Sequence, residues 1–344
     1  LPGGQALTER FGLRMSGVAP GTGRLTLNGR TVKLHGWCHH MQWPQTAASP
    51  TEEQMDDDLD MMVSAGTNYI RGGHYPQDPR WLDRLDERGI AMWEETMGPN
   101  PTIENLLDWE YFMPLQMQQM DEMMDMSMNH ASIYTWGFFN EGPSYDARVC
   151  PAYAACAAHA RKRDPTRFQT WANNWTTDQC LEHASLLAFN WYPGWYDAVD
   201  PTTGWHAYAA QMHHRFPDKP FVISETGAGG IYEWSHNATA AKWTQGFQAE
   251  LIAKDVKAGL SNGNISGMTL WHWNDFKIKD GDTVSCGHCD FLPGVYPPTC
   301  KYINPETPSC SGRPGGKNHK GVVDFWRRPK ESFQVVKKLY TEYQ

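Results

Sequence analysis

The sequence predicts a (β/α)8 barrel, an α/β fold in which eight parallel strands alternate with helices. First, short apolar runs of strand character recur eight times from residue 33 onward, with helical or loop sequence between them. Second, the length of 344 residues suits one large domain with insertions, because such barrels need about 250 residues. Third, Glu141 and Glu225 fall at the ends of the fourth and seventh runs, and the catalytic groups of such barrels lie at the ends of strands.

The eight strand candidates follow one another along the chain. They are VKLHGW (the 33–38 region), TNYIRGG (67–73), IAMWEE (90–95), SIYTWGFF (132–139), RFQTWANN (167–174), LLAFNWY (186–192), FVISE (221–225) and GMTLWHW (267–273). Residues 52–66 and 79–89 have the apolar spacing of helices, and a long segment at about 104–129 leads into the fourth strand. This alternation favours a parallel sheet with crossover helices, and eight such units favour closure into a barrel.

We divide the chain into an N-terminal extension, residues 1–30, and a catalytic domain, residues 31–344. Residues 277–317 break the strand–helix pattern, because they are rich in Gly, Pro and Cys and lack helical periodicity. We interpret them as a loop after the eighth strand that disulfides staple over the catalytic face.

Four cysteines lie in this loop: Cys286, Cys289, Cys300 and Cys310. The Cys-Gly-His-Cys spacing also permits a zinc site with Cys300, Cys310 or His288, so a zinc-dependent hydrolase is one alternative. Disulfides are favoured in an oxidising compartment, and we expect neither a metal nor another cofactor. The remaining cysteines, Cys38, Cys150, Cys156 and Cys180, cannot be paired from the sequence.

The composition indicates which classes of partner to exclude and in which compartment to expect the protein. The formal net charge is −9 and no block of Lys and Arg stands out, which argues against nucleic acid and anionic membranes as partners. No apolar run reaches the roughly 18 residues that span a bilayer. The chain begins at Leu1 rather than Met, as after removal of a leader or propeptide or at a cloning boundary. Together with eight cysteines and sequons at Asn174, Asn237 and Asn264, this predicts a secreted, disulfide-bonded glycoprotein.

The stretch TWGFFNEG ends an apolar strand with Asn140 and Glu141. Burying an unpaired carboxylate is costly, so we expect Glu141 to lie where the strand opens into a cleft. Glu225 ends the seventh strand in the same way, before a Gly-rich loop. Two carboxylates that flank a glycosidic bond can divide the work, since one protonates the leaving oxygen and the other attacks the anomeric carbon.

Two structural alternatives remain for this pair. Either glutamate could cap a loop or pair with an arginine, and the barrel could be a catalytically silent module that binds glycans through aromatic side chains. The chain has 16 Trp and 14 Tyr, although most of these are expected to fill the core. A binding module has no need of two crowded carboxylates, so an enzyme that acts on oligosaccharides or polysaccharides is favoured.

Six ordered motifs resemble the catalytic barrel of glycoside hydrolase family 2, the family of β-galactosidases, β-glucuronidases and β-mannosidases. They are the segments 67–96, 129–142, 189–198, 219–230, 270–277 and 318–333, and residues 9–14 and 25–40 resemble the entry into that barrel. Members of the family normally carry sugar-binding and immunoglobulin-like domains ahead of the barrel, where this sequence has a short piece. An acidic residue commonly follows the first-strand histidine, where this sequence has Met41 and Gln42.

The resemblance implies that Glu141 is the acid/base, Glu225 the nucleophile and Asn140 the contact to the sugar 2-hydroxyl. It implies that Arg71 and His74 support the nucleophile and line the sugar subsite. An arginine near Glu225 would hold it ionised, while Glu141, lacking that partner, would keep the higher pKa that an acid needs.

The resemblance extends to further binding residues. It implies that Tyr192 donates a hydrogen bond near the nucleophile, that Trp271 floors the subsite and that His40 contacts the sugar. A core position is the alternative for Trp271, and a satisfied structural histidine is the alternative for His40.

Asn318 and Lys320 resemble an Asn-x-Lys element with which β-glucuronidases hold the substrate carboxylate. A solvated loop lysine is the alternative. We therefore expect a retaining β-glycoside hydrolase of β-galactosidase type, acting on a galactoside or galactan, with a β-glucuronidase-type uronide hydrolase close behind.

Overall fold

The computed structural model describes residues 8, 10–235, 241–278 and 312–343, together with the backbone of the strands at 287–290 and 299–302. Eight parallel strands form a nearly closed barrel in the order β8-β7-β6-β5-β4-β11-β10-β9, which confirms the predicted fold. The strands are β4 (Leu34–Cys38), β5 (Tyr69–Gly72), β6 (Ala91–Glu95), β7 (Ile133–Asn140), β8 (Phe168–Ala172), β9 (Leu187–Asn190), β10 (Phe221–Thr226) and β11 (Gly267–Leu270). Each corresponds to one of the eight strand candidates.

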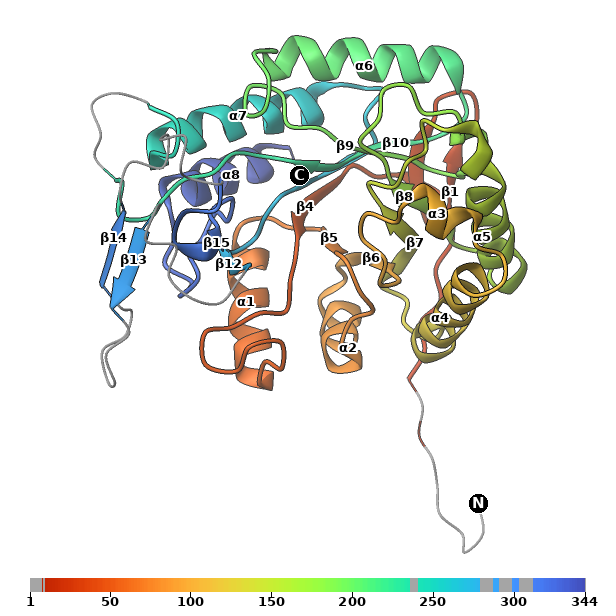
Figure 1. Ribbon diagram of the computed structural model, residues 1–344, viewed down its shortest axis with the longest axis horizontal. Helices are drawn as coiled ribbons and strands as arrows, with labels where there is room; N and C mark the ends of the chain where they lie inside the picture. The colour runs from red at the N-terminus through yellow and green to blue at the C-terminus, as the bar shows by residue number, and fades with distance from the viewer. Residues whose placement is uncertain are drawn as a thin grey trace, which may run out of the picture.

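Helices surround the strands (Figure 1). They are α1 (Glu52–Ser64), α2 (Pro79–Arg88), α3 (Ile103–Leu107), α4 (Phe112–Ser127), α5 (Cys150–Arg163), α6 (Pro201–Arg215), α7 (Gln245–Ser261) and α8 (Glu331–Glu342). The termini of α2 follow from its sequence: Asp78 accepts a hydrogen bond from Arg80 N, Pro79 opens the first turn, and Gly89 ends the helix at φ 68°. No described helix is long and apolar enough to cross a membrane.

The barrel closes between β8 and β9, where the chain crosses over without an α-helix and has only the short 3-10 helix η2 (Leu181–His183). Two backbone hydrogen bonds bridge the seam, from Asn173 N to Ala188 O at 3.0 Å and from Asn190 N to Asn173 O at 2.6 Å. The loop that carries Asn173 and Asn174 is therefore tied directly to the next strand.

The N-terminal extension forms a three-stranded antiparallel sheet of β1 (Ser16–Ala19), β2 (Arg24–Leu27) and β3 (Arg30–Thr31). Leu25 is fully buried and packs with the apolar side chains that fill the lower barrel, among them Leu34, Tyr69 and Trp93. The sheet therefore covers the amino-terminal end of the barrel, opposite the ends at which Glu141 and Glu225 lie.

The end of β7 departs from regular strand geometry. Its pairing with β8 shifts between Gly137 and Asn140, and Phe139 and Glu141 both have φ of 53°. In a regular strand neighbouring side chains point to opposite faces, but a bulge allows two successive residues to share one face. Asn140 and Glu141 therefore both reach the same cavity.

The predicted Cys-rich loop lies largely outside the described residues. The described part contains the hairpin of β13 (Gly287–Asp290) and β14 (Thr299–Tyr302), which stands away from the barrel (Figure 1). The predicted bonds of its four cysteines fall outside the described side chains. One disulfide is present elsewhere, between Cys150 and Cys180, while Cys38 and Cys156 are buried free thiols.

Candidate active site

A cavity of about 480 Å³ opens at the carboxyl ends of the barrel strands. Eight of the predicted site residues line it: His74, Asn140, Glu141, Tyr192, Glu225, Trp271, Asn318 and Lys320. Asn174, the first of the sequons, lines it as well.

Two strong donors hold Glu225. Arg71 Nη1 donates to Glu225 Oε1 at 2.6 Å, and the Tyr192 hydroxyl donates to Glu225 Oε2 at 2.6 Å. The Glu225 side chain is almost completely buried, so each carboxylate oxygen depends on these protein donors. Such donors bind a carboxylate strongly and fix its orientation, as a nucleophile requires.

Arg71 is fully buried and connects three strand ends. Besides Glu225 it donates to Asn140 Oδ1 at 2.8 Å and to both carboxylate oxygens of Glu95, at 3.1 and 3.2 Å. Although burial alone would lower it, the carboxylates of Glu95 and Glu225 raise the pKa of Arg71 well above its ordinary value. The guanidinium is thus a fixed cation beside the candidate nucleophile.

Asn190 at the end of β9 is a site residue that the sequence prediction missed. Its Nδ2 donates to Asn140 Oδ1 and to Glu141 Oε1, both at 3.0 Å, while its Oδ1 accepts from Ser224 Oγ at 2.7 Å. The oxygen of Asn140 thus accepts from Arg71 and Asn190, which leaves its amide nitrogen to donate to a ligand. Its position at a strand end in FNWY was the one available signal.

Glu141 lies in a different environment from Glu225. Its one side-chain hydrogen bond to a described residue comes from Asn190, a neutral donor. Burial, and next the negative charge of Glu225, raise the pKa of Glu141 above its ordinary value. A raised pKa suits a carboxyl group to act as a general acid.

Glu95 is the second site residue that the sequence prediction missed. It is buried at the end of β6 and binds Arg71 and His74 Nδ1, the latter at 2.8 Å. Its neighbour Glu94 points to the opposite face, where it accepts from Gln77 N at 3.1 Å. The Glu-Glu pair in IAMWEE indicated a strand end. The sequence alone did not show which of the two side chains points into the barrel and which points away from it.

Aromatic rings form one wall. The ring of His74 stacks on Trp271 with centroids 5.2 Å apart, and Trp271 lines the cavity. His40 packs behind them, against Trp271 at 5.3 Å and Phe276 at 4.6 Å, and is not among the lining residues. The structure thus places His40 and Arg71 behind the cavity wall, and the other predicted residues on it.

Lys320 occupies the far side of the cavity. Its side chain is almost fully buried among the rings of Tyr192, Trp195 and Tyr196, and its Nζ donates to Tyr196 Oη at 2.7 Å. Burial, and next the nearby Arg313, lower the pKa of Lys320 well below its ordinary value. Within the described part of the chain this lysine has no ion pair, so an anionic ligand group would stabilise its charged form.

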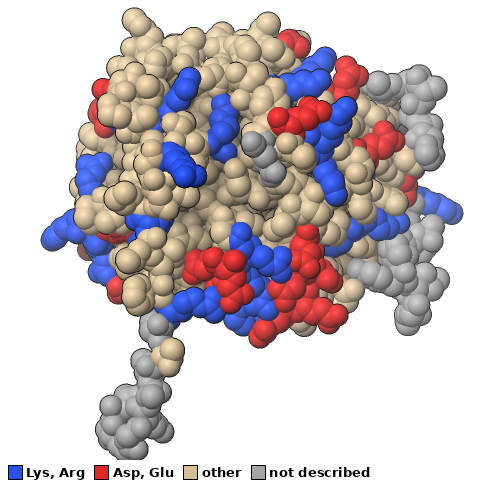
Figure 2. Space-filling view, turned by 180° about the vertical axis from the view of Figure 1, so that it is seen from behind, with Lys and Arg blue, Asp and Glu red and all other residues tan. Residues whose placement is uncertain are grey.

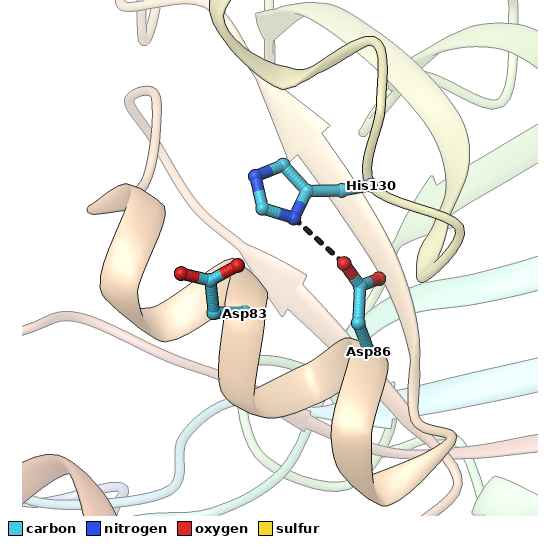
Figure 3. Close-up of side chains that lie close together, drawn as sticks. All are labelled: Asp83, Asp86 and His130. Carbon is cyan, nitrogen blue, oxygen red and sulfur yellow. Dashed lines mark hydrogen bonds and ion pairs between the residues drawn. The ribbon is translucent and has the colours of Figure 1, made fainter. Parts of the chain in front are cut away.

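Three potential metal ligands converge elsewhere, where Asp83 and Asp86 of α2 face His130 (Figure 3). His130 Nδ1 already lies 2.7 Å from Asp86 Oδ2, and Asp86 Oδ1 accepts from Ser132 N at 2.7 Å. Because an ion pair and a backbone contact account for Asp86 and His130, we assign no metal to this group.

On the face shown in Figure 2, acidic and basic side chains intermingle, without a continuous basic track such as a phosphate backbone requires.

Comparison with known proteins places this geometry in a family. Residues 20–295 match the family model described as "Glycosyl hydrolases family 2, TIM barrel domain". The chain belongs to glycoside hydrolase family 2. Among proteins similar to this family 2 barrel are a β-glucuronidase of Bacteroides fragilis, 29% identical over 79% of this chain and 40% of that protein, and a β-galactosidase of Vibrio vulnificus, 28% identical over 81% and 27%.

Solved structures of the family agree with the fold. A family 2 β-galacturonidase from Eisenbergiella tayi bound to galacturonate superposes with a TM-score of 0.84 at 29% identity, covering 98% of this chain and 55% of that one. A β-glucuronidase from Ruminococcus gnavus, 20% identical, gives a TM-score of 0.79 over 96% and 53%. This family 2 chain spans less than half the length of the curated relatives named above.

Proposed function

We propose that this chain is the catalytic barrel of a retaining β-glycoside hydrolase in which Glu225 is the nucleophile and Glu141 the acid/base. One contrast carries the proposal: two glutamates share one cavity, and one is held by a cation and a phenol while the other has a raised pKa. Two carboxyl groups in such different surroundings can take different roles, one as the nucleophile and the other as the acid.

The reaction proceeds in two displacements. Glu225 attacks the anomeric carbon while Glu141 donates its proton to the departing glycosidic oxygen, which breaks the bond and leaves an ester between sugar and Glu225. Glu141, now a carboxylate, then takes a proton from a water molecule that attacks the anomeric carbon and releases Glu225. The amide nitrogen of Asn140 donates to the 2-hydroxyl, an interaction that strengthens as charge develops.

We propose a β-linked uronic acid as the sugar that enters the cavity. The sequence placed a galactoside slightly ahead, but the burial of Lys320 without an ion pair among described residues favours a substrate that brings a carboxylate. Asn318 and Arg313 line the same cavity. The resemblance to proteins named β-glucuronidase and β-galacturonidase supports this choice.

The proposed mechanism is tested with activated 2-deoxy-2-fluoro β-glycosides of the glucurono, galacturono and galacto series. The fluorine slows hydrolysis of the ester, so intact mass and peptide mapping would reveal a sugar on Glu225. We expect a label from a uronide and none in Glu225→Ala. A folded protein that takes no label from any of them would contradict the hydrolase proposal and favour a glycan-binding barrel.

The sugar preference is tested with Lys320→Gln. Loss of a charge-assisted contact of about 1.5–3 kcal/mol should slow labelling by the uronide about 10- to 100-fold and leave the galacto reagent unaffected. Equal effects on both reagents would instead assign Lys320 a structural role.

We also propose that the protein works in an oxidising compartment outside the cytosol. The disulfide between Cys150 and Cys180 supports this, because such bonds persist where thiols are not kept reduced. Comparing intact mass before and after glycosidase treatment of secreted material would test the predicted glycosylation.

A further inference from the structure

Two aromatic side chains stand exposed on the loops after β7 and β8, and one of them follows the cavity-lining residue Asn174 directly. Tyr145 follows β7 and Trp175 follows β8, and their relative exposures are 37% and 40%. Their rings contact edge to face with centroids 4.5 Å apart. Exposing the apolar faces of two large rings to water is unfavourable, and such a pair is typical of a surface that a ligand covers.

The loops that carry these rings are fixed by hydrogen bonds. Asn173 Oδ1 accepts from Trp175 N at 3.1 Å and its Nδ2 donates to Trp175 O at 2.8 Å, so one side chain clamps the Trp175 backbone. Ser144 Oγ donates to the same Asn173 oxygen at 2.8 Å, and Gln179 Nε2 donates to Tyr145 O at 2.9 Å. The ring pair is therefore presented in a set orientation.

The position of the pair relative to Glu141 suggests its ligand. Glu141 opens the loop that leads to Tyr145, and Asn174, next to Trp175, lines the cavity together with Glu141. Since the acid protonates the leaving oxygen, the leaving group would lie on the Glu141 side. The proposed function assigns the reacting sugar to the part of the cavity that Trp271 and Lys320 line.

We propose that Trp175 and Tyr145 form a binding site for the sugar ring of the leaving group, which packs its C–H face on the indole. This assignment rests on the proposed hydrolase function and adds to it the residues that recognise the second sugar. It also identifies the substrate as a glycan with a sugar on both sides of the cleaved bond.

The same site would bind an acceptor sugar when the glycosyl ester is transferred to a sugar hydroxyl in place of water. An acceptor hydroxyl attacks the anomeric carbon of the Glu225 ester, its proton passes to the Glu141 carboxylate, and the ester bond breaks to free Glu225. An acceptor held on Trp175 therefore accelerates recovery of an enzyme trapped as its 2-fluoroglycosyl ester. This readout does not require the natural linkage to be known.

The experiment compares recovery of activity in buffer alone with recovery in phenyl β-glucoside, cellobiose or N-acetylglucosamine. We expect at least one acceptor to accelerate wild-type recovery. Trp175→Ala and Tyr145→Ala should each reduce the second-order rate constant for that acceptor about fivefold, with recovery in buffer unchanged. Trp175→Phe should lie between, and Tyr343→Ala, which removes an exposed ring at the end of α8, should match wild type.

Two results would overturn the assignment: an acceptor response that Trp175→Ala and Tyr145→Ala leave intact, or wild-type recovery that no acceptor accelerates. Failure of the reagent to label Glu225 would be a separate result, which contradicts the hydrolase proposal itself. Equal labelling of variants and wild type would establish that the cavity is intact in each protein.

Discussion

The guanidinium of Arg71 contacts side chains at the ends of three other strands: Glu95 of β6, Asn140 of β7 and Glu225 of β10. A planar group with several fixed donors can fix the angles between its acceptors as well as their distances. Lysine has the same charge but offers no such geometry.

We therefore expect Arg71→Lys to slow labelling of Glu225 by about 100-fold while the fold persists, because a small misplacement of the nucleophile carries a penalty of that order. Arg71→Ala should in addition lower the free energy of unfolding by about 3–5 kcal/mol, since it leaves Glu225 and Glu95 buried without their cation. Labelling rates and urea unfolding measure the two effects. A lysine variant with wild-type labelling would show that charge alone suffices.

Glu141 offers a test by pH. The charge of Glu225 helps to raise its pKa, so Glu225→Gln should lower the pKa of Glu141 towards its ordinary value. Carbon-13 NMR of the Glu141 carboxyl group would follow this titration. Formation of the ester on Glu225 removes the same charge, so the trapped enzyme should show a shift in the same direction. An unchanged midpoint in both would contradict the coupling of the two glutamates.

The sequence predicted those individual site residues that lie in a recognisable local motif. Glu141 and Glu225 end apolar strands, and their surroundings exclude a solvated surface position. Asn190 and Glu95 act through partners on other strands, at sequence distances of 49 and 24 residues. No local pattern in the sequence records such contacts.

A disulfide joins Cys150, the first residue of α5, to Cys180 in the connection after β8. It closes a segment of 30 residues that includes the Asn173–Trp175 clamp. A cross-link over such a segment restricts the unfolded chain.

Replacing both Cys150 and Cys180 by Ala should lower the free energy of unfolding by about 3–4 kcal/mol. Urea unfolding with and without reductant would measure this. Wild type should lose stability on reduction, and the double variant should be indifferent to the reductant. Indifference of the wild type would show that the bond contributes nothing to stability.

The sequence predicted all eight barrel strands because buried parallel strands are continuous apolar runs. The sheet of β1 to β3 was expected only as an extension, since its short strands are half-exposed and lack such runs. The segment at 104–129 divides into α3 and α4, because Asp108 accepts from Glu110 N and Tyr111 N in the turn between them. Such local side-chain bonds compete with helix continuation.

In the outer layer of the whole molecule, α6 and α7 bury one ionisable group that the site does not use. Asp255 accepts from Trp205 Nε1 at 3.0 Å and is fully buried, and burial raises its pKa to about 8. The folded protein therefore keeps a proton that the unfolded chain loses above about pH 4. Stability contributed by this site falls as the pH rises from about 4 to 8 and is constant above that range.

Asp255→Asn should remove this dependence, which amounts to at most about 1.4 kcal/mol per pH unit, and should keep the bond from Trp205. Urea unfolding of both proteins at pH 5, 6, 7 and 8 measures the slope. The variant should gain on the wild type as the pH rises. Parallel stability curves would mean that Asp255 is ionised in the folded protein.

The substrate could not be predicted at the scale of the whole chain. The Asn-x-Lys string is compatible with a solvated lysine, and the packing of Tyr192, Trp195 and Tyr196 around Lys320 distinguishes a buried lysine from an exposed one. Those rings approach Lys320 across more than 120 residues of sequence.

The small sheet around Leu25 and the packed side chains next to it fill the amino-terminal end of the described barrel. The cavity opens at the other end, where the strands have their carboxyl ends. The part of a substrate that binds farthest from the opening can leave only after the part nearer the opening has left. Under the proposed mechanism, release would be ordered: the leaving group would depart before water arrives, and the freed sugar would depart after hydrolysis. The free sugar would then compete with substrate for the resting enzyme, while the leaving group would act on the loaded intermediate and return it to substrate.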